Sequence, residues 1–237
     1  MDSTAYVGTE LELFALAEHW KRYLGNKIAK RLGERVLEVG AGLAETTPWL
    51  CQGAHQTWIC LEPDTDMCAQ IASKILTNHL PTFCKAYNGT TDSLCDQGFE
   101  FDSILYIDVL EHISNDRAEL RRAASLLSMN GEIIILAPAH DFLFSDFDAE
   151  IGHFKRYNKK NLEQACSGVL NIQSLKYLDS VGMLASLANR WLLGQPVPTK
   201  RQILFWDNFM VRASKFFDPL FGHAVGKSLL AVLRPMR

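Results

Sequence analysis

Two glycines and a distant carboxylate form the pattern in this sequence that is best suited to chemistry. A short apolar run, Val36-Leu37-Glu38-Val39, leads into Gly40-Ala41-Gly42, and Glu62 follows about twenty residues later. Glycines permit a tight turn and a close approach of the backbone to a ligand. A carboxylate at the tip of the next strand can accept hydrogen bonds from both ribose hydroxyls. The spacing therefore predicts a nucleoside-binding site.

The residues after the glycines indicate which nucleoside is bound. NAD requires a pyrophosphate at the N-terminus of the following helix, but Ala44 replaces the third glycine of that fingerprint and Glu45 adds a negative charge there. S-adenosylmethionine has no phosphate and carries a sulfonium cation, which suits this turn better. Tyr157 also does not form a Tyr-x-x-x-Lys pair, since Asn161 stands four residues after it. S-adenosylmethionine is therefore favoured over NAD and an oxidoreductase is disfavoured.

These motifs resemble those of the class I S-adenosylmethionine-dependent methyltransferases. Leu37 to Gly42 followed by Glu62 resembles the cofactor signature, Phe101 to Ile113 the fourth-strand segment, and Leu127 to Pro138 the fifth, so the resemblance covers about residues 35 to 140. It implies ten cofactor-binding residues: Glu38, Gly40, Ala41, Gly42, Glu62, Pro63, Thr90, Thr91, Asp108 and Val109. Glu62 would hold the ribose, Gly89 to Asp92 would flank the adenine, and Asp108 with Val109 would lie near the methionine part. Ala44 and Thr90 depart from the family pattern, and weaker adenine contacts are expected.

A second candidate segment, Phe147 to Tyr157, lies just beyond the expected fifth strand, where ligands approach the carboxyl ends of an open sheet. It resembles a segment found in some small-molecule methyltransferases, including relatives of the quinone-pathway O-methyltransferases. His153 is the candidate catalytic base for a substrate hydroxyl. His112, Arg156 and Tyr157 are the candidate substrate-binding residues, and Arg156 could hold a carboxylate or phosphate. The alternative is that His153 and Arg156 only tie the loop to Asp148 or Glu150.

Short apolar strands alternating with helices predict the scaffold for these residues. The expected fold is α/β, doubly wound and Rossmann-like, with a seven-stranded, mostly parallel sheet covered by helices on both faces. Strands are expected at 35–39, 57–61, 82–87, 101–107, 131–137, 171–178 and 228–233, and helices at 9–32, 46–52, 67–77, 117–127 and 158–170. The chain is read as one domain, 1–237, with an N-terminal helical segment (1–33), a cofactor-binding core (34–140) and a substrate-side segment (141–237).

The substrate-side segment should contain a helical insertion at about 180–226, before the last strand. Its aromatic residues could form the floor of an apolar substrate pocket, although an aromatic stripe at helical spacing is more often core; they are Trp191, Phe205, Trp206, Phe209, Phe216 and Phe217.

Composition restricts the partners. The 237 residues carry a net charge of −3, which argues against nucleic acid as the partner. The six cysteines include no C-x-x-C pair, so neither a metal nor a disulfide is expected. With no leader-like start and no long apolar run, a cytoplasmic location is expected. The basic, aromatic region after residue 190 makes a membrane surface a less favoured partner.

The sequence thus predicts an enzyme that methylates a small-molecule acceptor and releases S-adenosylhomocysteine. The acceptor atom stays open among oxygen, nitrogen and carbon, and so does the oligomeric state. Two alternatives remain, a non-catalytic S-adenosylmethionine-binding regulatory protein and a peripheral lipid or quinone methyltransferase.

Overall fold

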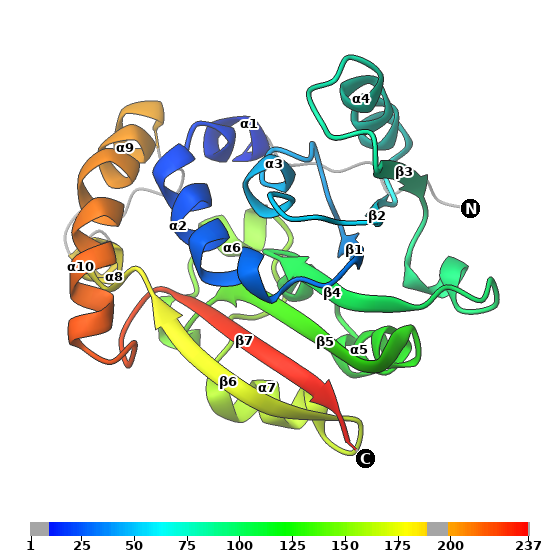
Figure 1. Ribbon diagram of the computed structural model, residues 1–237. Helices are drawn as coiled ribbons and strands as arrows, with labels where there is room; N and C mark the ends of the chain where they lie inside the picture. Colours follow the sequence, from blue (N-terminus) through cyan, green and yellow to red (C-terminus); the bar gives the residue numbers. More distant parts are fainter. Residues whose placement is uncertain (1–9, 189–198, 237) are drawn as a thin grey trace.

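A single sheet of seven strands runs through the structure, a computed structural model that describes residues 10–188 and 199–236 (Figure 1). The strands are β1 (Arg35–Val39), β2 (Thr57–Glu62), β3 (Cys84–Asn88), β4 (Phe101–Ile107), β5 (Leu127–Pro138), β6 (Leu170–Leu178) and β7 (Ser228–Pro235). Their order in space is β3-β2-β1-β4-β5-β7-β6. Strand β7 runs antiparallel to both of its neighbours, and the pairings among β1 to β5 are parallel.

Helices cover both faces of this sheet. They are α1 (Glu10–Ala15), α2 (Glu18–Ile28), α3 (Thr47–Leu50), α4 (Thr65–Leu76), α5 (Asp116–Ser125), α6 (Asp146–Glu150), α7 (Lys159–Cys166), α8 (Ser180–Ala188), α9 (Lys200–Phe205) and α10 (Arg212–Leu220), with a π-helical stretch, Trp206–Val211, between the last two. The fold class expected from the sequence is confirmed.

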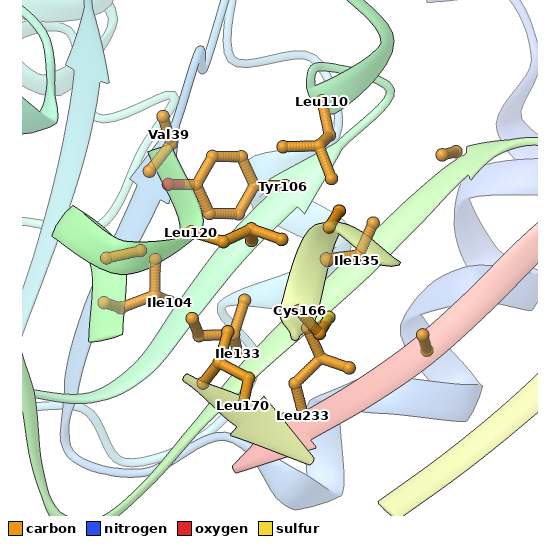
Figure 2. Packing of buried hydrophobic residues seen from close by; sticks show 14 of the residues in the cluster. Val39, Ile104, Tyr106, Leu110, Leu120, Ile133, Ile135, Cys166, Leu170 and Leu233 are labelled. Atoms are coloured by element: carbon orange, nitrogen blue, oxygen red, sulfur yellow. The ribbon is translucent and has the colours of Figure 1, made fainter. Parts of the chain in front are cut away.

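The two faces carry separate hydrophobic clusters because neighbouring residues of a strand point to opposite sides. Leu37 of β1 packs in the cluster beneath α5 and α7, whereas Val36 packs in the cluster beneath α2, α3 and α4. Figure 2 shows the first cluster, where Ile133 and Ile135 of β5 point to the same side. Strands buried on both sides explain the nearly continuous apolar runs in the sequence.

Some expected boundaries differ from the structure. The helix expected at 46–52 is reduced to the four residues of α3. The helix expected at 158–170 ends at Cys166, just before Gly168, which has a φ of +79°. Strand β5 begins four residues before the expected Gly131. The insertion is helical as expected, while residues 189–198, and with them Trp191, lie outside the described residues.

The helical insertion is fastened to the N-terminal segment. The Asp207 carboxylate accepts hydrogen bonds from the backbone N–H groups of His19 (3.0 Å) and Trp20 (2.8 Å), which belong to the first turn of α2. The rings of Trp20 and Trp206 lie 5.8 Å apart between centroids. First-turn N–H groups have no partner inside their own helix, so this distant carboxylate completes the start of α2.

Candidate active site

A cavity of about 1070 Å³ opens at the carboxyl ends of β1, β4 and β5. Its wall combines the glycine turn with parts of α1, α2, α6, α8 and α9. Clefts at this edge of an open α/β sheet are the usual ligand sites of such folds. The predicted site residues that line it are Glu38, Gly40, Ala41, Gly42, Asp108, His112, His153 and Arg156.

The glycine turn leaves no room for a side chain at its first position. Gly40 has a φ of +62°, and a Cβ atom there would lie 2.8 and 2.9 Å from the two methyl groups of Val109. Gly42 has a φ of +56° and its N–H donates to Glu62 Oε2 at 2.8 Å. Ala44, where the family usually has glycine, is also left-handed with a φ of +53°. That conformation costs an alanine about 1–2 kcal/mol, which explains the usual preference for glycine.

Glu62 ends β2 immediately beside the glycine turn. Its second oxygen, Oε1, accepts from the backbone N–H of Asp64 at 3.0 Å. Burial raises the pKa of this carboxyl, while the two backbone hydrogen bonds act in the opposite direction. The carboxylate is thus held in one position, one hydrogen bond away from a residue of the cavity wall.

The expected adenine-side residues lie close to Glu62 but outside the cavity wall as the structure describes it. The Asn88 side chain donates to the backbone carbonyls of Glu62 and Pro63, which joins the ends of β2 and β3. Thr90 is exposed, whereas Thr91 is buried and its hydroxyl donates to Glu119. The side chain of Thr91 therefore supports α5.

Glu38 is a buried carboxyl beneath the glycine turn. Its Oε2 accepts hydrogen bonds from Thr47 Oγ1 and Trp58 Nε1, both at 2.8 Å. Burial raises its pKa to about 7, even though both hydrogen bonds favour the ionised form. Glu38 therefore fixes β1 to β2 and α3 in addition to lining the cavity.

This raised pKa predicts a pH-dependent stability. Because the folded-state pKa lies above the unfolded value of about 4.3, the contribution of Glu38 is fully present below that value and is lost as the pH rises toward 7. The Glu38→Gln variant keeps an oxygen acceptor and does not titrate. Between pH 4.5 and 7.5 its free energy of unfolding should therefore rise relative to that of wild type by on the order of 2 kcal/mol, and its relative Tm should rise with it. Thermal melts of both proteins across that range check this, and a constant difference would contradict it.

Asp108 follows the last residue of β4 and lines the cavity, with a φ of +54°. Its side chain is exposed and forms part of the cavity wall. Desolvation by the surrounding protein raises its pKa to about 6, against the opposing influence of His153 and Lys227. The neighbouring Val109 packs against Gly40, so it shapes the turn from behind.

The loop that carries His153 and Arg156 is tied down by Asp148. His153 Nδ1 hydrogen-bonds Asp148 Oδ1 at 2.9 Å, and Arg156 donates to both carboxylate oxygens at 3.0 and 2.9 Å. Burial alone would raise the pKa of Asp148, but these partners hold it well below its usual range. The loop-tying role weighed from the sequence is therefore present. His153 and Arg156 nevertheless both line the cavity.

Glu111 is a site residue that the sequence reasoning missed. It is fully buried, and its Oε1 lies 3.8 Å from His153 Nε2. Burial and the Asp108 charge raise its pKa well above the usual range. Its neighbour His112 packs edge-on against His153 with 4.6 Å between ring centroids, and burial lowers the pKa of His112 to about 4. The available signal was the run Asp108-Val-Leu-Glu111-His112, in which two carboxylates and an imidazole follow one strand.

Lys227 is a second missed residue. It lies on the cavity wall, 3.5 Å from Asp179 Oδ2 and 4.0 Å above the ring of Trp206. Burial lowers its pKa. It comes from the segment just before β7, far from every motif in the sequence, so no spacing rule could have indicated it.

Tyr157 differs from the expectation of substrate contact. Its side chain is fully buried in the core, and its hydroxyl donates to Asp116 Oδ2 at 2.8 Å. The aromatic insertion is similarly divided, since Trp206 and Phe205 line the cavity while Phe209, Phe216 and Phe217 are exposed. Most of these aromatic side chains therefore neither line the cavity nor pack in the hydrophobic core.

Comparison with known proteins agrees with this geometry. A family model described as a methyltransferase domain matches residues 37–133. A demethylmenaquinone methyltransferase of Tropheryma whipplei (strain Twist) is 30% identical over 138 residues, which is 57% of this chain and 55% of that protein. The chain thus spans about half the length of the curated relative it matches.

Solved structures share the whole fold at low identity. A SAM-dependent methyltransferase from Archaeoglobus fulgidus superposes with a TM-score of 0.62 at 16% identity, covering 96% of this chain and 97% of that one. The [4+2]-cyclase SpnF superposes with a TM-score of 0.61 at 14% identity, covering 91% and 81%. The matched segment, residues 37–133, contains the glycine turn and the acidic end of β2 and is similar to a methyltransferase domain, and the chain has the Rossmann-like fold of these solved structures.

Proposed function

We propose that this protein transfers a methyl group from S-adenosylmethionine to a small-molecule acceptor. The observation that carries the proposal is one cavity that joins the glycine turn at Gly40–Gly42 to Asp108 and to the loop of His153 and Arg156. A cofactor placed along the turn would direct its methyl group toward that loop. The acceptor would occupy the remainder of the cavity.

Methyl transfer from a sulfonium requires mainly alignment. The cofactor supplies both the methyl group and the leaving group, so the protein holds the acceptor atom in line with the methyl–sulfur bond and excludes water. Acidic side chains such as Asp108 favour the sulfonium cation over the neutral product electrostatically. Apolar wall residues such as Leu143, Phe144 and Trp206 would enclose a largely apolar acceptor.

Polar groups at the far end of the cavity would orient the acceptor. Arg156 and Lys227 bring positive charge to the wall, and we propose that they face an anionic or oxygen-bearing group of the acceptor. His153 is the proposed proton acceptor if the acceptor atom is a hydroxyl oxygen. Its hydrogen bond to Asp148 supports that role, because it fixes the ring and directs Nε2 away from Asp148.

We also propose a cytoplasmic location.

The first test is isothermal titration of the purified protein with S-adenosylhomocysteine, with NAD as the control ligand. We expect one site per chain for S-adenosylhomocysteine and no heat with NAD. Binding of NAD in place of S-adenosylhomocysteine would overturn the proposal. Transfer of labelled methyl from S-adenosylmethionine to acceptors of a phenol, amine and carboxylic acid library then tests turnover. Binding without any labelled product would favour the non-catalytic regulatory protein. The fold alone does not decide the reaction, since the [4+2]-cyclase SpnF shares it.

A second candidate, methylation of a lipid or quinone at a membrane surface, is favoured by one observation. Phe209 and Phe216 are 65% and 71% exposed, and Arg201 and Arg212 are exposed on the same α9–α10 segment. Exposed aromatics beside basic residues suit the interface of an anionic bilayer. Among the described residues, no helix is long and apolar enough to cross a membrane.

Vesicle flotation tests this second candidate. Wild type should float with vesicles that contain about a third phosphatidylserine at low salt, and the Phe209→Ser, Phe216→Ser double variant should float at least about tenfold less, since each buried ring contributes about 1.5–3 kcal/mol. Leu76→Ser provides a control, because Leu76 is 84% exposed but lies on α4. Equal flotation of all three proteins, or none by wild type, would remove the membrane reading.

A further inference from the structure

Three side chains of the cavity wall, one carboxyl group and two imidazoles, lie close together. Glu111, His112 and His153 each offer one ligand atom, and these atoms all lie within 4.8 Å of one another. Two of the residues lie in the short 3-10 helix after β4, Leu110–His112, and the third comes from the loop after α6. All three line the cavity.

Glu111 is the observation that distinguishes this cluster from an ordinary packed group. Its side chain is fully buried, and among the described residues neither oxygen has a hydrogen-bond partner on another residue, so that the one hydrogen bond favouring the ionised form comes from the backbone N–H of Glu111 itself. A buried carboxyl group left in this way costs free energy in either protonation state, and most when it is ionised, so folded proteins rarely keep one. The nearest group is the His153 imidazole, whose Nε2 lies at 3.8 Å, too far for a hydrogen bond.

Nearby positive side chains stabilise the ionised form of Glu111 only in part, since Arg156 lowers the pKa of this group while burial raises it more. Arg156 is paired with Asp148 at 2.9 Å, and Lys227 is 3.5 Å from Asp179. Asp108 adds another carboxylate to the same cavity. Among the described residues, Arg156 and Lys227 are thus ion-paired with carboxylates other than those of Asp108 and Glu111.

The second layer of contacts is arranged as it is around metal-binding histidines. His153 Nδ1 is hydrogen-bonded to Asp148, which leaves Nε2 facing Glu111, and Asp148 is itself held by Arg156. A carboxylate behind the imidazole fixes the tautomer and increases the basicity of the ligating nitrogen. His112 is hydrogen-bonded to the backbone of Gly152.

We infer that Glu111, His112 and His153 bind a divalent transition-metal cation, with open coordination positions toward the cavity. Ligand atoms on a cation with bonds of about 2.0–2.2 Å lie about 3–4 Å apart, so the three side chains need only a small inward movement. Two imidazoles and one carboxylate suit zinc, iron(II) or manganese better than magnesium, which prefers oxygen ligands. This inference revises the expectation of no metal drawn from the cysteine spacing.

The role of the cation rests on the proposed methyl transfer, although its binding does not. An acceptor hydroxyl on the open position would lose its proton to water more readily. Its oxygen would then form the bond to the methyl carbon as the methyl–sulfur bond breaks and S-adenosylhomocysteine leaves. His153 is then a ligand and does not act as the base.

Cobalt(II) binding to chelator-treated protein tests the site without any need for turnover. We expect one equivalent to bind, with visible absorption bands of a coordinated ion, a higher Tm, and weaker binding by magnesium. Glu111→Gln and His153→Ala should each weaken cobalt binding at least about 100-fold. Asp148→Asn changes a residue that holds His153 but contributes no ligand atom, and it should weaken binding about 10- to 100-fold. His79→Ala is the matched control, since His79 is an exposed histidine on another part of the chain.

The outcomes separate this inference from the proposed function. Absence of stoichiometric cobalt binding by wild type, or undiminished binding by Glu111→Gln and His153→Ala, would overturn the metal site. Titration of S-adenosylhomocysteine into the same preparations reports the cofactor site independently. Normal S-adenosylhomocysteine binding by a protein that binds no metal would overturn only the metal site. Metal binding by a protein that does not bind S-adenosylhomocysteine would overturn only the proposed methyl transfer.

Discussion

Replacing Glu62 by alanine should weaken S-adenosylhomocysteine binding by at least about 100-fold. Hydrogen bonds to a charged group contribute about 1.5–3 kcal/mol each. The variant would lack the two hydrogen bonds that the ribose hydroxyls donate to the carboxylate, and this loss corresponds to two or more orders of magnitude in Kd. The carboxylate is also already oriented by the N–H groups of Gly42 and Asp64, so binding needs little further ordering. Isothermal titration measures the change directly.

Two further variants make this result interpretable. Glu62→Gln keeps the shape of the side chain but loses the charge and one acceptor, so its loss should fall between wild type and Glu62→Ala. Asp66→Asn removes an exposed carboxylate four residues later, on the first turn of α4, and should bind normally. Wild-type affinity in Glu62→Ala, with a folded protein by circular dichroism, would refute the assignment of Glu62 to the ribose.

Replacing Asp218 by alanine should cost about 3–5 kcal/mol of unfolding free energy, as is typical when one member of a buried charged network is removed. Asp218 is fully buried in α10. Its carboxylate accepts from the Tyr23 hydroxyl (2.8 Å), from the backbone N–H groups of Asp179 (2.8 Å) and Ser180 (2.9 Å), and from Ser180 Oγ (2.6 Å). All four donors would be left without their partner. For a chain of this length the Tm should fall by about 6–20 °C.

A graded comparison checks the origin of that loss. Tyr23→Phe removes one of the four hydrogen bonds and keeps the ring, so it should cost only about 1 kcal/mol. Asp146→Ala, at the exposed start of α6, should change the Tm by less than either. If Asp218→Ala melted within a few degrees of wild type, the four contacts would not stabilise the fold as described.

The sheet and the cofactor turn were predictable because both depend on local patterns. Strands such as β1 and β4 are apolar on both faces and have the expected bounds. Gly40 and Gly42 adopt the positive φ angles for which glycine is suited. In both cases the information lies within a few neighbouring residues.

The remainder of the candidate site depends on contacts between distant segments. Lys227 reaches the cavity only because β7 returns beside β5, and Glu111 was passed over in favour of the more obvious imidazole of His112. Tyr157 stands next to a cavity residue in the sequence, yet its side chain points into the core and bonds Asp116. A motif identified the neighbourhood of these residues, but the direction of each side chain came from packing.

The position of β7 also has a consequence for the order of folding. Strand β6 is made before β7 but pairs with it alone in the sheet, since β7 lies between β5 and β6. During synthesis, therefore, the strands from β1 to β5 can associate as they emerge, whereas β6 has to wait for a strand made about fifty residues later. The edge of β6 that later pairs with β7 therefore stays unpaired in that interval.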